Sequence, residues 1–241
     1  MTTSRGKLTV LVIATGLLLF LGWRVLSLGM ADHFAASQPE RAVFWRGDHP
    51  EALFRLAERQ AVAKQWPKAE ASAKAALQSN RLDGRPLRIL AQAAESRGQT
   101  GKARVLFQQA VRWAPRDLPS HLWLFQNALR RRDAQAAIQH MDALFRLRPA
   151  LLADMRLQAE VLAANPVTRP VLAKTLLAAP PWRAGYLQGL GTSILATDDL
   201  APMFEQLGRQ AELKPGEIDP WLDRLRRENR YTQAYLTWAN W

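Results

Sequence analysis

The N-terminal part of the chain is a long run of apolar positions with no polar stripe. Residues 8–23 (LTVLVIATGLLLFLGW) contain no charged residue and only two threonines. A helix over residues 8–30 would extend about 35 Å, enough to cross a hydrocarbon core about 30 Å thick. Arg24 lies near its far end, where the side chain can reach the interface, and Trp23 suits the interfacial aromatic belt. The pattern predicts a transmembrane helix over residues 8–30.

The flanking charges predict how this helix is oriented. Arg5 and Lys7 precede the apolar run, and no acidic residue lies among them. By the positive-inside rule the N-terminus then stays in the cytoplasm, and everything after residue 30 is translocated. Residues 1–30 are therefore expected to form a cytoplasmic stub and an uncleaved anchor. The alternative is a signal peptide cleaved before Asp32, which places the same residues outside the cytoplasm.

A different pattern begins at residue 50 and repeats every 34 residues. Three segments, 50–83, 84–117 and 118–151, align without gaps. Small or apolar residues recur at the seventh (Leu56, Leu90, Leu124), eighth (Ala57, Ala91, Phe125), twentieth (Ala69, Ala103, Ala137), twenty-fourth (Ala73, Phe107, Met141) and twenty-seventh (Ala76, Ala110, Leu144) places. In the middle segment, Gly98 can supply a left-handed backbone conformation, which suits a turn.

On these residues, segment 50–151 resembles the tetratricopeptide repeat (TPR) family, and the whole chain resembles a membrane-anchored bacterial TPR-like protein. The unit of this family is a 34-residue helix–turn–helix. Pro115 and Pro149 at the thirty-second place fit the end of the second helix, whereas Arg81 and His121 depart from the pattern. The resemblance implies an all-α fold, in which an α-solenoid of three TPR-like repeats over 50–151 follows the transmembrane helix.

Helical patterns continue after residue 151, but the repeat becomes degenerate. Helices are expected over residues 152–164, 170–179, 183–196, 199–212 and 218–228, and a last pair runs from Ile218 into a helix that stops at Trp241. Either Trp241 packs back as a cap or the chain once continued, and we expect truncation. Residues 31–49 are expected to link the anchor to the repeats, with Phe44 and Trp45 lying on the first repeat or on the membrane surface.

Composition narrows the possible functions. The 241 residues include no cysteine, which excludes disulfides, a thiolate nucleophile and cysteine-ligated metals. The net charge of +12 suggests nucleic-acid binding, and residues 81–148 hold 13 basic against 5 acidic residues. This charge falls on turns and outer faces, as at Arg130–Arg132, and forms no continuous basic stripe. A solvated basic surface is therefore expected, with no nucleic-acid partner.

The sequence offers no catalytic constellation. No two of the four histidines have the i, i+4 spacing of a helical metal site, and no G-x-S-x-G is present. Residues 98–102 (GQTGK) only superficially resemble a phosphate-binding loop, because the spacing is too short and Ala103 replaces the Ser or Thr. Glycines 185, 189 and 191 are spaced for close helix packing. No enzymatic activity, catalytic residue, metal ligand or cofactor is therefore expected.

The resemblance instead implies binding of a protein or peptide in a concave groove lined by the first helices. The groove residues predicted from it are Phe54, Glu58, Arg85, Arg88, Gln92, Leu122 and Gln126. Arg85 and Arg88 are expected to hold a carboxylate or acidic segment of the partner, and Phe54 and Leu122 to give apolar contact.

These expectations combine into one function. The chain is predicted to be a single-pass adaptor of the bacterial inner membrane, with its repeats in the periplasm. It would bind a partner of the cell envelope, for example in polysaccharide export or secretion. Two alternatives remain: a cleaved, soluble periplasmic binding protein, or the helical portion of a larger protein whose functional domain lies beyond residue 241.

Overall fold

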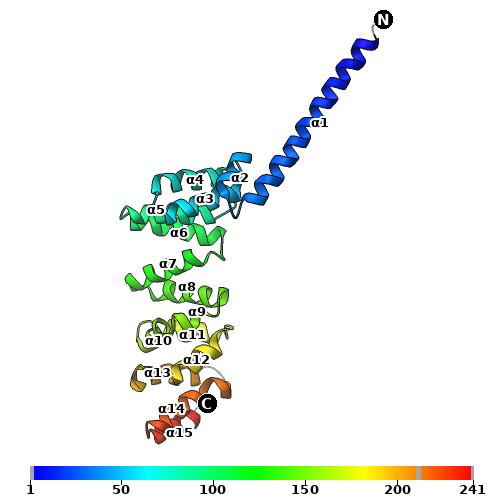
Figure 1. Cartoon of the computed structure of the whole chain (residues 1–241). Helices are drawn as coiled ribbons and strands as arrows, with labels where there is room; N and C mark the ends of the chain where they lie inside the picture. Colours follow the sequence, from blue (N-terminus) through cyan, green and yellow to red (C-terminus); the bar gives the residue numbers. More distant parts are fainter. Residues whose placement is uncertain (1–2, 210–212, 240–241) are drawn as a thin grey trace. The chain divides into compact units, whose positions relative to one another are not determined.

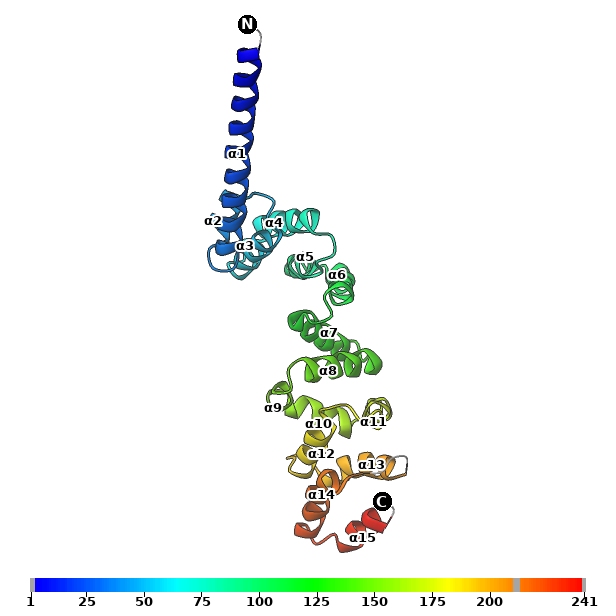
Figure 2. The same ribbon diagram turned by 90° about the vertical axis from the view of Figure 1, so that its right-hand side faces the viewer.

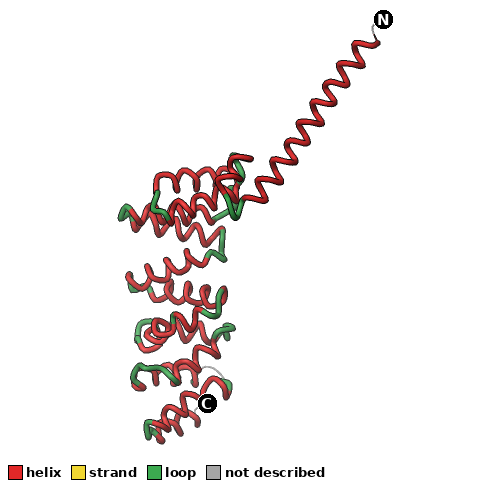
Figure 3. The backbone as a smooth tube through the Cα atoms, viewed as in Figure 1, coloured by secondary structure: helices red, strands yellow, loops and turns green. Residues whose placement is uncertain are grey.

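The computed structural model describes residues 3–209 and 213–239, with side chains from Leu8 onward. The chain is 78% helical, and the described residues form fifteen helices and no strand (Figure 3). This confirms the all-α prediction. The contacts divide the chain into two compact units, Met1–Asp117 and Leu118–Trp241.

The first unit begins with one long apolar helix, α1 (Thr3–Phe34; Figure 1). Its apolar side chains are exposed all around the helix; Leu19, for example, is 70% exposed. The stretch Leu8–Phe34 is long and apolar enough to cross a membrane, and it exceeds the predicted span of residues 8–30 by four residues. The prediction of an N-terminal apolar helix is confirmed.

The expected linker over residues 31–49 is instead largely helical and packed. Helix α1 continues to Phe34, and α2 (Pro39–Trp45) lies beside its end in both ribbon views (Figures 1 and 2). Fully buried Ala31 and Ala42 contribute to the contact. This packing could not be predicted from the sequence, because alanines contribute little to a hydrophobic periodicity. Their small side chains nevertheless let two helix backbones approach closely.

Two helix pairs follow in the first unit: α3 (Pro50–Val62) with α4 (Trp66–Ser79), and α5 (Arg85–Ser96) with α6 (Thr100–Trp113). Lys64 and Gly98, 34 residues apart, take φ values of 57° and 74° at the two turns. In both pairs the residue after the turn donates its backbone N–H to a carbonyl of the preceding helix. Gln65 donates to the carbonyl of Gln60, and Gln99 to that of Ala94. The left-handed conformation predicted for Gly98 is confirmed.

The repeated small and apolar positions form the core of these pairs. Ala69, Ala73 and Ala76 on α4 are buried, as are Ala103, Phe107 and Ala110 at the equivalent places on α6. The same 34-residue spacing thus appears in burial and in turn geometry.

The second unit contains the remaining nine described helices: α7 (Leu118–Arg130), α8 (Ala134–Leu147), α9 (Leu151–Asp154), α10 (Arg156–Ala164), α11 (Arg169–Leu177), α12 (Arg183–Gly191), α13 (Thr197–Gly208), α14 (Pro215–Arg227) and α15 (Tyr231–Ala239). The α7–α8 and α14–α15 pairs turn on Arg132 (φ 57°) and Asn229 (φ 60°), the same type of turn as in the first unit. The alternatives raised for Trp241 lie outside the described residues.

Two predicted helices of this unit are corrected. The helix expected over residues 152–164 is divided at Met155, and the one expected over 183–196 ends at Gly191. A Cβ on Gly191 would lie only 2.6 Å from the carbonyl carbon of Pro220 on α14. The helix therefore ends where its backbone meets that of another helix, an approach that only glycine permits at this separation.

Aromatic contacts consolidate the core of the second unit. The rings of Phe204 and Trp221 stack with centroids 4.4 Å apart. Trp182 lies between Phe145 and Tyr186 in edge-on contacts of 5.4 and 5.7 Å, and its indole donates a hydrogen bond of 2.8 Å to Asp142. Burial raises the pKa of Tyr186 well above its ordinary value, so this phenol stays protonated and donates to the carbonyl of Ala159.

Candidate functional site

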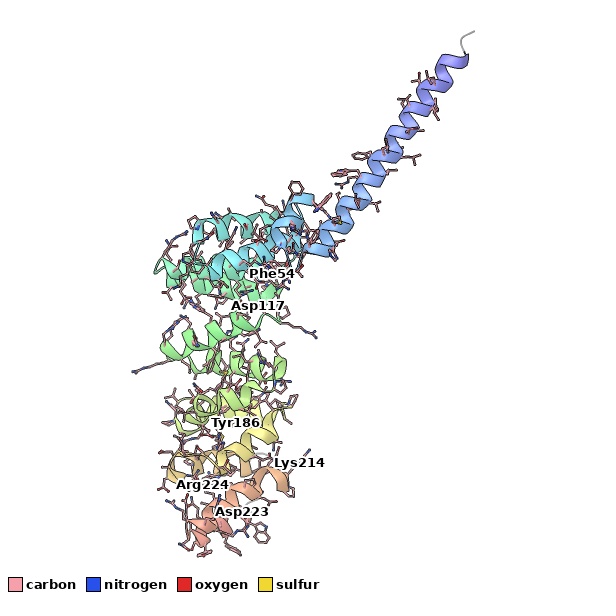
Figure 4. The ribbon with its side chains drawn as sticks, in the orientation of Figure 1. Phe54, Asp117, Tyr186, Lys214, Asp223 and Arg224 are labelled. Carbon is pink, nitrogen blue, oxygen red and sulfur yellow. The ribbon has the colours of Figure 1, made fainter. Side chains whose placement is uncertain are left out.

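Two predicted groove residues of the first unit, Arg85 and Arg88, lie against a third, Phe54, whose aromatic ring is buried on α3. Phe54 is only 2% exposed (Figure 4). The guanidinium carbons of three arginines lie over its ring: Arg85 at 4.4 Å, Arg55 at 5.6 Å and Arg88 at 5.7 Å. The arginines and the core cover the ring of Phe54, which argues against apolar contact between Phe54 and a ligand; that contact stays a prediction.

The same arginines form an alternating chain of ion pairs with four acidic residues. In spatial order the chain is Asp83, Arg85, Glu51, Arg55, Glu58, Arg88 and Asp117. Arg88 is 8% exposed and contacts both Glu58 and Asp117, the latter through a hydrogen bond of 3.2 Å. The four acids outnumber the three arginines, so the chain of ion pairs has a net negative charge.

The contacts among these ion pairs shift the pKa values of Glu51 and Arg85. Burial acts to raise the pKa of Glu51, but hydrogen bonds and charge from Arg85 and Arg55 outweigh burial and hold that pKa below its usual value. The hydrogen bond to Asp83, followed by that to Glu51, raises the pKa of Arg85 further above its already high value. Glu51 and Arg85 therefore stay charged, and Arg85 and Arg88 both contact carboxylates of this cluster. These contacts argue against the predicted clamp of Arg85 and Arg88 on a partner carboxylate.

Beside these ion pairs lies a hollow of about 430 Å³, lined mainly by residues of α3 and α5. It brings together three of the predicted site residues, Glu58, Arg88 and Gln92. The remaining lining residues are Ala61, Val62, Trp66, Ile89, Glu95 and Ser96. Buried Ala61 and Ile89 are apolar lining residues, and Val62 is 86% exposed.

Two polar side chains of the hollow remain available to a ligand. Gln92 and Glu95 form no side-chain hydrogen bond or ion pair with any residue that the structure describes. Both are half-buried on α5, one helical turn apart. With Arg88 occupied by Glu58 and Asp117, the free carboxylate of Glu95 favours a hydrogen-bond donor or a cation, and the Gln92 amide beside it can donate or accept a hydrogen bond.

The other two predicted residues belong to the second unit. Leu122, 39% exposed, and exposed Gln126 lie on α7. The hollow described above lies wholly within the first unit, so it is built without them.

Two histidines of the second unit, on α7 and α8, come together although their spacing gave no such signal. The Nδ1 atoms of His121 and His140 lie 3.1 Å apart. Burial, together with the charge of His121, lowers the pKa of His140 to about 4, so this ring is neutral at neutral pH. No group of three potential ligands that could hold a metal ion occurs among the described residues, and the pair has no third ligand to complete a site.

Neither family models nor curated protein sequences show a match to this chain. The likeness to a repeat family therefore rests on the residues and geometry given above.

Position within the repeat identified part of the site. Three of the residues predicted from their places in the first helices of the repeats, Glu58, Arg88 and Gln92, line the same hollow. The prediction did not include Val62 at the end of α3, Trp66 at the start of α4, or Ile89 within α5. The aromatic residue just after the turn at Lys64–Gln65 was the available signal for Trp66.

Proposed function

We propose that the chain is a membrane-anchored TPR-like adaptor of the bacterial envelope that holds a peptide segment of a partner protein in the hollow between α3 and α5. The spacing of the helix pairs supports the TPR-like solenoid. The second helices of three successive pairs start 34 residues apart, at Trp66, Thr100 and Ala134. The hollow itself is the observation that carries the proposal, because repeats of this type bind partners on the faces of their first helices.

The chemistry of the hollow selects the kind of peptide. We expect an apolar side chain to rest on Trp66, Ala61 and Ile89, and a lysine, arginine or N-terminal amine next to it to contact Glu95. We therefore propose a peptide with a basic group in place of the acidic peptide segment expected from the sequence. Arg85 and Arg88 already contact carboxylates of the protein itself.

The contacts of α1 favour an uncleaved anchor over a released binding protein. Cleavage before Asp32 would remove Ser27 and Ala31, which are 3% and 0% exposed at the start of the folded region. Asp32, the first residue left after cleavage, accepts a hydrogen bond of 2.7 Å from His49 at the start of α3. Since α1 is part of the packing of the first unit, we propose that it is retained, with the helix pairs on the periplasmic side.

Site-specific photo-crosslinking in native membranes tests the binding site. A benzoylphenylalanine at position 92, in the hollow, is expected to capture a defined partner, whereas the same probe at exposed Gln78 on α4 is not. The substitution Glu95→Lys is expected to reduce capture at position 92 about tenfold or more, since it reverses the charge that faces the ligand. Equal capture at both positions, or capture unaffected by Glu95→Lys, would contradict the proposed site.

A further inference from the structure

Helix α2 forms a short hairpin with the end of α1. The N–H of Gln38 donates to the carbonyl of Phe34 at 2.8 Å, and α2 starts at Pro39. Ala31, Ala35 and Ala42 are buried at this end of the first unit, where the two helices contact each other.

The direction of α2 returns the chain toward the middle of α1. Near its start, the guanidinium of Arg41 lies 5.7 Å from the centre of the Phe34 ring; at its end, the Trp45 and Trp23 rings are 5.7 Å apart. Trp23 precedes Phe34 by 11 residues, which is roughly 16 Å of helix. A hydrocarbon core of about 30 Å takes up about 20 residues, so a span that starts at Leu8 includes Trp23 within its last turns. Helix α2 thus brings Trp45 back to the level where α1 would leave the hydrocarbon.

The side chains at this level are aromatic and basic. Phe44 is 84% exposed and Trp23 is 56% exposed, and the rings of Phe44 and Trp45 are 6.1 Å apart. Arg24 and Arg46 lie near Asp48. The hydrogen bond from Arg46 and the charges of both arginines lower the pKa of the Asp48 carboxyl, although burial acts to raise it. Of the nearby acids, Asp48 is held by Arg46, and Glu40 by Arg59 of α3.

This combination matches the chemistry of a membrane surface. Aromatic rings with a polar edge concentrate at the level of lipid headgroups, and arginines there are attracted to anionic headgroups. The exposed aromatic surface also continues that of α1, whose apolar side chains are exposed all around the helix. Continuity with a lipid-facing surface favours lipid over a second protein as the occupant.

We propose that Trp23, Phe44 and Trp45, together with Arg24, Arg41 and Arg46, form a collar that lies in the headgroup region of an anionic phospholipid bilayer. The collar holds α2 and the helix pair that follows it against the membrane surface. This inference rests on the proposed insertion of α1.

The absence of native cysteine allows single-cysteine labelling of the full chain. We would attach an environment-sensitive NBD fluorophore at Phe44→Cys in the collar, at Leu17→Cys within α1 and at Val62→Cys. Phe44 and Val62 form a matched pair, since they are 84% and 86% exposed. Val62 lies at the end of α3 remote from His49, and α3 leads away from α1 (Figure 1).

The labelled chains are reconstituted into vesicles of phosphatidylethanolamine and phosphatidylglycerol. The probe at position 44 is expected to have blue-shifted emission, to be quenched by headgroup spin-labelled lipid, and to be several-fold less sensitive to aqueous iodide than the probe at 62. The probe at 17 is expected to be quenched by lipid with brominated acyl chains. Replacing Arg24, Arg41 and Arg46 with Gln is expected to restore iodide quenching at position 44 toward the value at position 62.

The possible failures are distinguishable. Iodide quenching at position 44 equal to that at 62, with the probe at 17 still quenched by brominated lipid, would overturn the collar and leave the anchor intact. A probe at 17 that brominated lipid does not quench would overturn both. Protection from iodide at 44 without quenching by spin-labelled lipid would assign this surface to a second copy of the chain and overturn the lipid proposal.

Discussion

At the scale of the residue, Arg88 shows how context changes the meaning of a side chain. Its position in the repeat marked it as a ligand for an acidic partner, yet it is buried between Glu58 and Asp117. Sequence position predicts which face of a helix a side chain occupies, but not which charges from other helices reach it first. Glu58 lies 30 residues away and Asp117 lies 29 away, so their pairing with Arg88 depends on how α3, α5 and the end of the unit come together.

The substitution Arg88→Met is expected to destabilise the first unit by about 3 kcal/mol, because it removes the cation from a largely buried group of charges. This corresponds to roughly 100-fold faster hydrogen exchange for those backbone amides of α3 and α5 that exchange only when the first unit unfolds. The control is Arg97→Met, which breaks a pair with Glu70 in which the arginine is 44% exposed, and which should cost less than about 1 kcal/mol. Equal exchange in the two variants of the full chain would refute a structural role for Arg88.

At the scale of the element, small residues determine where helices approach each other. Alanines lie between α1 and α2 and along α4, and Gly191 allows α12 to meet α14. The 34-residue period predicted the helices of residues 50–151 well, because the same core positions recur in each segment. Where that period fades, beyond residue 151, two predicted helices were too long. One is divided at Met155, and the other ends at Gly191, where the backbone of Pro220 comes close.

The neighbouring glycines of α12 provide a matched test of this packing. Gly191→Ala should cost about 1–3 kcal/mol, because its Cβ would overlap the backbone of Pro220 and force the two helices apart. Gly189→Ala meets nothing within 4 Å and should be neutral or stabilising by up to about 1 kcal/mol. Melting of the full chain, followed by circular dichroism, should therefore shift to lower temperature only for Gly191→Ala. Melting temperatures that move together would contradict the close approach.

At the scale of the whole molecule, an apolar N-terminal helix precedes a series of helix pairs along the chain. The sequence pattern was sufficient to predict the helical class, the apolar N-terminal helix and the turn at Gly98. It did not predict that residues 31–49 fold back onto α1, because a heptapeptide helix packed through alanines has little periodic signal of its own. The apolar helix α1 and the first helix pair are consequently continuous in their packing, through contacts such as that between Asp32 and His49.

The most direct test of the account is the topology of the full chain in the inner membrane. Single cysteines are placed at Thr2, before the apolar helix, and at Gln99, in the exposed turn between α5 and α6, and each is treated with a membrane-impermeant maleimide. In intact spheroplasts the account predicts labelling at position 99, and labelling at position 2 only after lysis, with both variants retaining their full mass. Labelling at position 2 but not at 99 in intact spheroplasts, or loss of residues 1–31 from the mature chain, would contradict it.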